Sequence, residues 1–307
     1  MNTIDICICT FQRDSVVDAL HSLADLHVPK SVRLGVIVID NDDTPSAKGR
    51  VEAAAQTLPH PVRYLHRPGR NISIARNAAL DASEADGLAF LDDDTTADPD
   101  WLERLHAMHL ANKSEVVLGP VEPIYPDGAP NWMPQSGIHA IKPVWVEGEI
   151  RTGYTCNVLI DRRRKAMADL RFDLSLGRSG GEDTDFFTVI HAQGGHIAYA
   201  PDAIVREPVT PGRLAFDWLA RRRYRMGQTH AHILLSRKGR SRWTSLPLAA
   251  AKLIYCGMAA LLTLPHARMR NMSVLRGCLH AGVIAGLVGQ SHLSLYGTPD
   301  PQEGRSA

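Results

Sequence analysis

Three adjacent carboxylates, Asp92, Asp93 and Asp94, follow the apolar pair Phe90 and Leu91. Neighbouring carboxylates repel and raise one another's pKa unless a cation lies among them, so the triplet predicts a metal site. Oxygen ligands in small number suit Mg²⁺ or Mn²⁺ shared with phosphate oxygens better than they suit zinc. Taken alone, the triplet fits equally well a solvated loop that caps a helix.

A second acidic pair, Glu182 and Asp183, follows two glycines and stands at the head of an expected helix. An enzyme that cleaves a diphosphate-linked sugar must neutralise charge on the leaving diphosphate and deprotonate the attacking hydroxyl. The triplet with its metal meets the first need, and the acidic pair offers a base for the second. The helix dipole also favours acidic groups at a helix start, so a helix cap that attracts an arginine is the other interpretation.

The elements that would position these groups alternate regularly. Apolar runs at Thr3–Cys9 and Val32–Ile39 predict buried parallel strands, and the stretch between them has helical spacing. The pattern continues up to the triplet, which predicts an α/β fold with an open, mostly parallel sheet and helices on both faces. In such sheets, ligands bind outside the carboxyl ends of the strands. The polar residues at those ends are Thr10, Asp40, Asp42 and the aspartate triplet.

Beyond the triplet, ranges 116–125 and 148–160 predict further strands. The Pro- and Gly-rich stretch 120–143 predicts a long irregular connection. Connections of that length are more often active-site loops than filler, so we expect this stretch to border the site.

The last third of the chain differs in composition. From Arg213 to Arg276 it carries thirteen Lys and Arg residues against one acidic residue. Leu246–Leu264 is apolar apart from Lys252, and a second apolar stretch runs from Met272 to Gln290. This pattern predicts a basic, apolar helical tail that contacts an anionic membrane surface, lying in the interface rather than spanning it. A pair of buried helices packed on the main domain is the alternative.

Composition excludes some classes of function. A formal net charge of +1 argues against nucleic acid as a partner. The five cysteines form no CxxC pair, which suits reduced thiols in the cytosol. The first residues lead directly into a strand without a charged and apolar leader, so we expect a cytoplasmic catalytic part.

Six short segments together carry a family resemblance. In this order and spacing the chain resembles the inverting glycosyltransferases of family two, with the GT-A fold, over about its first 230 residues. It looks most like the rhizobial, succinoglycan-type exopolysaccharide glucosyltransferases. The segments are TFQR at 10–13, VIDND at 38–42, NISIARNA at 71–78, FLDDD at 90–94, GGEDTDF at 180–186 and RRYRMG at 222–227.

The resemblance implies roles for individual residues on the donor side. Thr10, Arg13, Asp40 and Asp42 would line the nucleotide pocket, with Asp40 accepting a hydrogen bond from the uracil ring. Further contacts to the donor would come from Arg76 at the diphosphate, from the neighbouring Asn77, and from Arg222 and Arg225 on a later helix.

The resemblance also implies the reacting groups. Asp94, together with Asp92, would hold Mg²⁺ or Mn²⁺, and Asp92 or Asp93 would lie nearer the ribose. Asp183 would be the general base, with Glu182 beside it in the substrate site. One base and direct displacement imply inversion at the sugar, unlike a retaining glycosidase with its second carboxylate.

The expected function is therefore transfer of a single sugar, glucose by resemblance, from a UDP-sugar to a lipid-linked oligosaccharide in bacterial exopolysaccharide synthesis. The protein would act at the cytoplasmic face of the inner membrane as a peripheral or interfacial enzyme. Processive relatives carry an Arg-Trp motif, and here RRRYR at 221–225 stands in its place, which favours one addition. The resemblance implies a GT-A domain at 1–232, with a nucleotide half at 1–115 and an acceptor half at 116–232, and a tail at 233–307.

Two other functions fit parts of the sequence. Asp92–Thr96 satisfies the D-x-D-x-T pattern of aspartyl-phosphate phosphohydrolases, although three strand–helix units precede it. A non-catalytic saccharide- or lipid-binding scaffold would keep the fold and lack turnover. Loss of transfer with retained donor binding in Asp183→Asn would distinguish an enzyme from such a scaffold.

Overall fold

A computed structural model describes residues 1–164, 167, 169–237, 239 and 241–290. The chain forms two compact units, each described here separately. Among the described residues, the first unit comprises 1–124 and 140–208, and the second comprises 125–139 and 209–290. The boundary expected between 232 and 233 falls inside a helix of the second unit.

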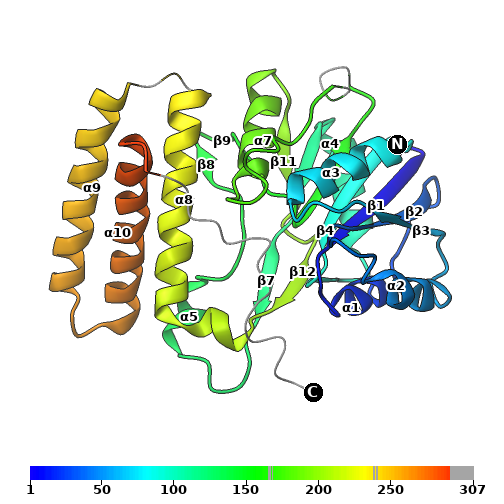
Figure 1. The fold of residues 1–307 in the computed structure, drawn as a ribbon, viewed down its shortest axis with the longest axis horizontal. Coiled ribbons are helices and arrows are strands. Elements are labelled where there is room, and N and C mark those ends of the chain that lie inside the picture. Colours follow the sequence, from blue (N-terminus) through cyan, green and yellow to red (C-terminus); the bar gives the residue numbers. More distant parts are fainter. Residues whose placement is uncertain (165–166, 168, 238, 240, 291–307) are drawn as a thin grey trace. The chain divides into compact units, whose positions relative to one another are not determined.

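A seven-stranded sheet in the order β11-β6-β10-β4-β1-β2-β3 forms the centre of the first unit (Figure 1). The antiparallel strand is β10, and the other six run parallel to one another, which confirms the predicted mostly parallel sheet. The strands are β1 (Thr3–Thr10), β2 (Arg33–Asp40), β3 (Val62–His66), β4 (Gly87–Asp92), β6 (Val116–Leu118), β10 (Asn157–Asp161) and β11 (Ile197–Tyr199).

Helices cover both faces of this sheet because its strands are apolar on both sides. In β1, Ile4, Ile6 and Ile8 join one hydrophobic cluster, whereas Cys7 joins the other. This alternation follows from the two-residue repeat of a strand. The first cluster includes residues of α1 (Val16–His21), α2 (Lys48–Ala55) and α4 (Trp101–Asn112), and the second includes residues of α3 (Ile72–Ala82) and α7 (Glu182–Ala192).

The later strands are shorter than predicted. The range 116–125 breaks after β6, at Gly119 and Pro120. Gly119 lies where an added Cβ would be 2.4 Å from the carbonyl oxygen of Ala203, so this close approach requires glycine. It resumes as β7 (Val121–Ile124), which pairs with β12 (Val205–Pro208), and β12 also pairs with β5 (Thr96–Ala97). The range 148–160 likewise divides into β10 and a small hairpin of β8 (Trp145–Val146) and β9 (Glu149–Ile150).

The second unit is helical among its described residues. Helix α10 (Ala267–Leu287) packs against both α8 (Phe216–Ser236) and α9 (Arg242–Leu262). An added Cβ at Gly282 would lie 1.9 Å from the carbonyl oxygen of Tyr224, so the backbones of α8 and α10 touch. The two predicted tail helices are thus confirmed as α9 and α10. The unit also contains α5 (Trp132–Ser136) and the 3₁₀ helix η1 (Pro211–Leu214).

Candidate active site

The register of the sheet brings the predicted strand-end residues to one edge. Thr10 of β1 pairs with Asp40 of β2, and Cys9 of β1 pairs with Asp92 of β4. Because β1, β2 and β4 are parallel, their carboxyl ends meet there. The expected grouping of the TFQR, VIDND and FLDDD motifs at one sheet edge is therefore reproduced in space.

The aspartate triplet is tied to the loop after β1 by an arginine. One terminal nitrogen of Arg13, Nη1, donates to Asp93 Oδ1 at 2.9 Å and to Asp94 Oδ2 at 2.7 Å. Burial, reinforced by the charge of Asp94 and opposed by that of Arg13, raises the pKa of Asp93 to about 6. Burial also raises the pKa of Asp92 to about 7, with Arg76 opposing and the other two carboxylates adding to it.

These observations fit a divalent cation at the triplet. Asp93 Oδ2 is buried and accepts no hydrogen bond from the residues that the structure describes. Raised carboxyl pKa values mean that the site disfavours its own negative charge, which an added cation relieves. Oxygen donors alone suit Mg²⁺ or Mn²⁺, and the assignment of Asp92 and Asp94 as the residues that would hold the ion stays a prediction.

A buried ion pair joins two of the distant motifs. Arg76 on α3 donates from Nη1 to Glu182 Oε1 on α7, and both side chains are buried. The Arg76 guanidinium also lies over the ring of Phe172, 5.7 Å from its centroid. Although burial opposes it, the charges of Glu182, Asp92 and Asp183 raise the pKa of Arg76, which keeps the arginine cationic. Arg76 is therefore the positive centre around which these carboxylates gather.

The two members of the acidic pair differ in environment. Glu182 is buried, and burial raises its pKa even though Arg76 opposes the shift. Asp183 is partly exposed, and its Oδ1 accepts from the backbone nitrogen of Thr184 at 2.6 Å. Gly180 and Gly181, with φ of 81° and 101°, form the turn before them, a conformation that favours glycine. Of the two, Asp183 is the carboxylate that a substrate can reach.

Asp40, predicted to accept a hydrogen bond from the uracil ring, is fully buried. Its side chain is 0% exposed. Its Oδ1 accepts from the backbone nitrogen of Asp42 at 3.1 Å, and its Oδ2 accepts from Ala47 N at 2.9 Å and from Tyr64 Oη at 2.7 Å. Both oxygens of the Asp40 carboxylate thus accept hydrogen bonds from within the protein, two of them from the loop between β2 and α2. Asp40 therefore fixes this loop, and its hydrogen bond to the uracil ring stays a prediction.

Asp42 lies in the same loop with a different set of partners. Its Oδ1 accepts from Gln12 Nε2 at 2.8 Å, which connects the loops after β1 and β2. Although burial opposes the shift, hydrogen bonds from Ser46 and Gln12 lower the pKa of Asp42. The carboxylate is thus held ionised between the two loops assigned to the nucleotide.

Asn77, predicted beside Arg76 in the substrate site, hydrogen-bonds the backbone of Phe172. Its side-chain nitrogen donates to Phe172 O at 2.9 Å, and its side-chain oxygen accepts from Phe172 N at 2.8 Å. Asn71 caps α3 and donates to Leu174 O at 2.9 Å, and Ser73 donates to Asp173 O at 2.8 Å. The NISIARN motif therefore clamps segment 172–177. Asn71 before a helical pattern signals a cap, but nothing local in the sequence signals the clamp.

Two further sets of polar residues belong to the predicted or candidate chemistry. Arg222 and Arg225 lie on α8 in the second unit, where the Arg222 guanidinium is 5.3 Å from the Trp218 ring centroid, and their contact with a diphosphate stays a prediction. His27, Asp100 and Glu103 bring ligand atoms within 4.8 Å of one another, but Asp100 is already bound by His27 and Arg104.

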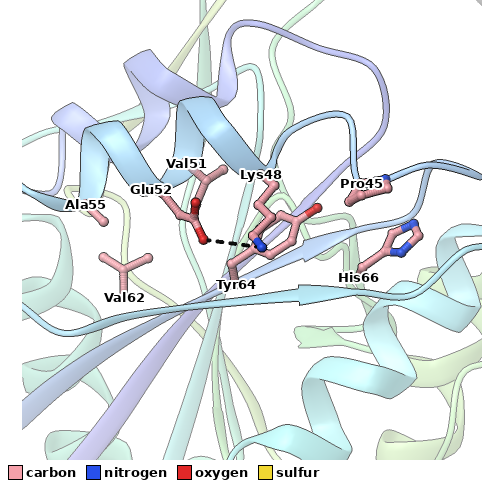
Figure 2. Close-up of a pocket in the computed structure, with 8 residues that line it drawn as sticks. All are labelled: Pro45, Lys48, Val51, Glu52, Ala55, Val62, Tyr64 and His66. Atoms are coloured by element: carbon pink, nitrogen blue, oxygen red, sulfur yellow. Dashed lines mark ion pairs between the residues drawn. The ribbon is translucent and has the colours of Figure 1, made fainter.

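A groove of about 540 Å³ lies beside α2 and the edge strand β3 (Figure 2). Lys48 and Glu52 form an ion pair of 3.8 Å in it, and Tyr64 and His66 extend from β3. The aspartate triplet and the acidic pair do not line this groove. Tyr64 and His66 nevertheless connect the groove to the loop after β2, because Tyr64 Oη donates to Asp40 Oδ2 and His66 Nε2 lies 2.8 Å from Asp42 O.

Comparison with known proteins agrees with the geometry. The family model described as glycosyl transferase family 2 matches residues 5–166. The chain is 49% identical over 296 residues to the succinoglycan biosynthesis protein ExoM of Rhizobium meliloti (strain 1021), covering 96% of each. It is 24% identical over 247 residues to a glucosyl-dolichyl phosphate glucuronosyltransferase of Haloferax volcanii, covering 73% of this chain and 75% of that protein.

Solved structures share the fold. The mannosyltransferase PcManGT from Pyrobaculum calidifontis, in complex with GDP-Man and Mn²⁺, aligns with a TM-score of 0.62 at 20% identity, covering 92% of this chain and 86% of that one. S. aureus TarS 1–349 in complex with UDP-GlcNAc aligns with a TM-score of 0.54 at 17% identity, covering 95% and 93%. At these identities the likeness establishes the GT-A fold.

Proposed function

Because the chain belongs to glycosyl transferase family 2, we propose that it transfers one sugar from a UDP-sugar to a hydroxyl of a lipid-linked oligosaccharide during bacterial exopolysaccharide synthesis. Glucose is the expected sugar. The proposal rests on the full-length similarity to the succinoglycan protein and on the chemistry of the charged edge. The phosphohydrolase and scaffold alternatives lose support, because the family model spans the triplet and the preceding strand–helix units.

One observation carries the catalytic assignment. Arg76 is buried in an ion pair with Glu182 and also close enough to Asp92 and Asp183 for their charges to raise its pKa. The group that would hold the metal and the group that would act as base therefore belong to one electrostatic cluster. A transferase needs both within the reach of one bound sugar.

Within this cluster the chain's own residues divide the work. Glu182 neutralises Arg76 and fixes the start of α7, so that the adjacent Asp183 presents a carboxylate toward the acceptor. Asp183 takes the proton from the attacking hydroxyl oxygen. Arg13 holds Asp93 and Asp94 together, and Asp92 and Asp94 would bind Mg²⁺ or Mn²⁺. When bound, such an ion neutralises charge that develops on the leaving diphosphate.

A single base implies one displacement. The hydroxyl oxygen attacks the anomeric carbon while the bond from that carbon to the diphosphate oxygen breaks, so an α-linked donor yields a β-linked product. The released UDP carries the electron pair of the broken bond. A retaining route would need a second carboxylate nucleophile beside the sugar, a role for which Glu182 is unsuited, because it is buried against Arg76.

The acceptor and the place of action are proposed from composition as well as similarity. A lipid-linked oligosaccharide is presented at a membrane, and the second unit supplies a basic, apolar surface suited to anionic headgroups. Helix α9 is long and apolar enough to cross a bilayer, which by itself is weak support. We place the enzyme at the cytoplasmic face of the inner membrane.

UDP release tests the reaction directly. The full chain is mixed with UDP-glucose and a lipid-linked oligosaccharide extract, with and without Mg²⁺ or Mn²⁺. We expect release that needs both metal and acceptor and that is lost in Asp94→Ala and Asp183→Asn. Asp25, an exposed carboxylate on the surface, provides the matched controls Asp25→Ala and Asp25→Asn, which should retain full release. Hydrolysis of simple phosphoesters without any UDP release would instead restore the phosphohydrolase assignment.

A further inference from the structure

Helix α9 exposes a continuous apolar row along its whole length. On an α-helix, positions three or four apart share a face. Trp243 is 85% exposed, Leu261 68%, Ile254 62% and Met258 53%, which is unusual for large apolar side chains in an aqueous protein. The full row, which we call the outer row, consists of Trp243, Pro247, Ala251, Ile254, Met258 and Leu261, all exposed.

The charged residues of α9 lie on the other side. Ser245, Ala249 and Cys256 are the buried residues of the helix and mark the side that packs on α10. At about 100° per residue, Arg242 and Lys252 each lie about 40° from the direction of Cys256, whereas Ile254 and Met258 lie about 160° from it. Burial and then the charge of Lys252 lower the pKa of His280 on α10, which agrees with this placement. The outer row therefore contains no charge.

Cations stand at both ends of this row without acidic neighbours in the sequence. Arg242 begins α9 and Arg268 follows its end, and both are exposed. From Trp218 to Gln290 the chain carries no Asp or Glu. An apolar strip bordered by positive charge is complementary to an anionic lipid surface, where headgroups attract the cations and acyl chains accept the strip.

From these observations we propose that α9 lies in the plane of an anionic membrane leaflet, with the outer row inserted among the acyl chains. The inference deepens the proposed function, on whose membrane acceptor it rests. A spanning α9 would put Lys252, the midpoint of the helix, at the bilayer centre and its two basic ends at opposite surfaces. Lying in plane instead keeps Arg242, Lys252 and Arg268 at one headgroup layer.

Vesicle flotation of the full chain tests the surface. The vesicles contain phosphatidylglycerol and phosphatidylcholine, or phosphatidylcholine alone. We expect binding to the anionic vesicles, reduced by high salt, and at least a tenfold loss in Ile254→Glu/Leu261→Glu. The matched control is Leu110→Glu/Val144→Glu, which places the same charges at exposed apolar residues of the first unit and should bind like the parent. Equal binding of both double variants would overturn the proposal.

Two further measurements distinguish an in-plane helix from a spanning helix and from a dimer interface. The parent and the variants Trp243→Phe/Ile254→Trp and Trp243→Phe/Leu261→Trp each place one tryptophan on the outer row. The quenching that each shows beyond the Trp243→Phe chain, which reports the other four tryptophans, should be equal for lipids brominated near the headgroup. Selective quenching at 254 by lipids brominated near the midplane would mean a spanning helix and contradict the proposal.

A vesicle-free dimer that Ile254→Glu/Leu261→Glu dissociates would assign the row to a second copy of the chain. UDP-glucose binding without vesicles, which none of these changes should alter, reports independently on the proposed function.

Discussion

The carboxyl edge of the central sheet buries charged side chains, whereas the outer row of α9 exposes apolar ones. At the sheet edge, charged side chains such as Arg76 and Glu182 are buried and paired, whereas on α9 large apolar side chains such as Trp243 and Leu261 are exposed. Folding alone favours neither arrangement, since charge is costly to bury and apolar surface is costly to expose. Each region therefore points to a ligand outside the chain: a phosphorylated, metal-bound donor at the edge, and a lipid surface at the helix.

The largest expected effect is the loss of transfer when Asp183, the partly exposed member of the acidic pair, is replaced. Asp183→Asn should lower the transfer rate by about 10²- to 10⁴-fold, because the attacking hydroxyl loses its base. Donor affinity and the midpoint of urea unfolding should change little, since Asp183 is partly exposed. UDP release, UDP-glucose titration and a denaturation curve measure the three quantities. A rate within threefold of the parent would remove Asp183 from the reaction.

Breaking the buried ion pair should reduce both stability and transfer. Arg76→Ala leaves Glu182 as an uncompensated buried charge, which should reduce the free energy of unfolding by about 3 to 5 kcal/mol. Arg76→Met/Glu182→Leu removes both charges and should recover most of that stability while transfer stays lost. Urea unfolding of the three proteins checks this. Single and double variants of equal stability would show that the pair is not coupled.

The triplet should make the metal-free protein less stable as pH rises. The folded pKa values of Asp92 and Asp93, about 7 and about 6, lie above the unfolded value, so the folded state binds more protons in between. Stability should therefore fall from about pH 4 to about pH 7, by on the order of 7 kcal/mol at about 1.4 kcal/mol per proton and pH unit, and level off above. Thermal unfolding in a chelator measures the slope. Asp92→Asn should flatten it, and Mn²⁺ should stabilise more at pH 8 than at pH 5; an unchanged slope in the variant would refute the assignment.

The smallest expected changes in stability come from alanine substitutions at two glycines of the second unit. Gly282→Ala puts a Cβ 1.9 Å from the Tyr224 carbonyl oxygen, so α8 and α10 must separate, at a cost of about 1 to 3 kcal/mol. Gly257→Ala on α9 meets nothing within 4 Å and should stabilise the helix by roughly 0.5 to 1 kcal/mol. Urea unfolding compares them, and a loss of stability in Gly257→Ala would mean that its surroundings are packed.

Much of the first unit could be predicted from the order of residues. Apolar runs and helical spacing are local patterns, and they indicated the parallel strands, the covering helices and the strand ends that carry Thr10 and Asp92. The acidic pair at the start of α7 was likewise visible, because glycines and a helical pattern flank it. The later strands were overextended, since the close approach of Ala203 to Gly119 comes from residues far away in sequence.

The sequence by itself determined which residues could be charged, apolar or helical, because those properties belong to each residue and its near neighbours. Only the tertiary structure decided which carboxylates bind partners within the protein and which one remains accessible to a ligand. Asp40 is fully buried by bonds to Ala47 and Tyr64, and Glu182 is bound by Arg76, which leaves Asp183 accessible. The tertiary structure equally decided that α10 covers one side of α9 and leaves the outer row exposed. Burial depends on what packs against a residue, and that partner is set by contacts between segments distant in the chain.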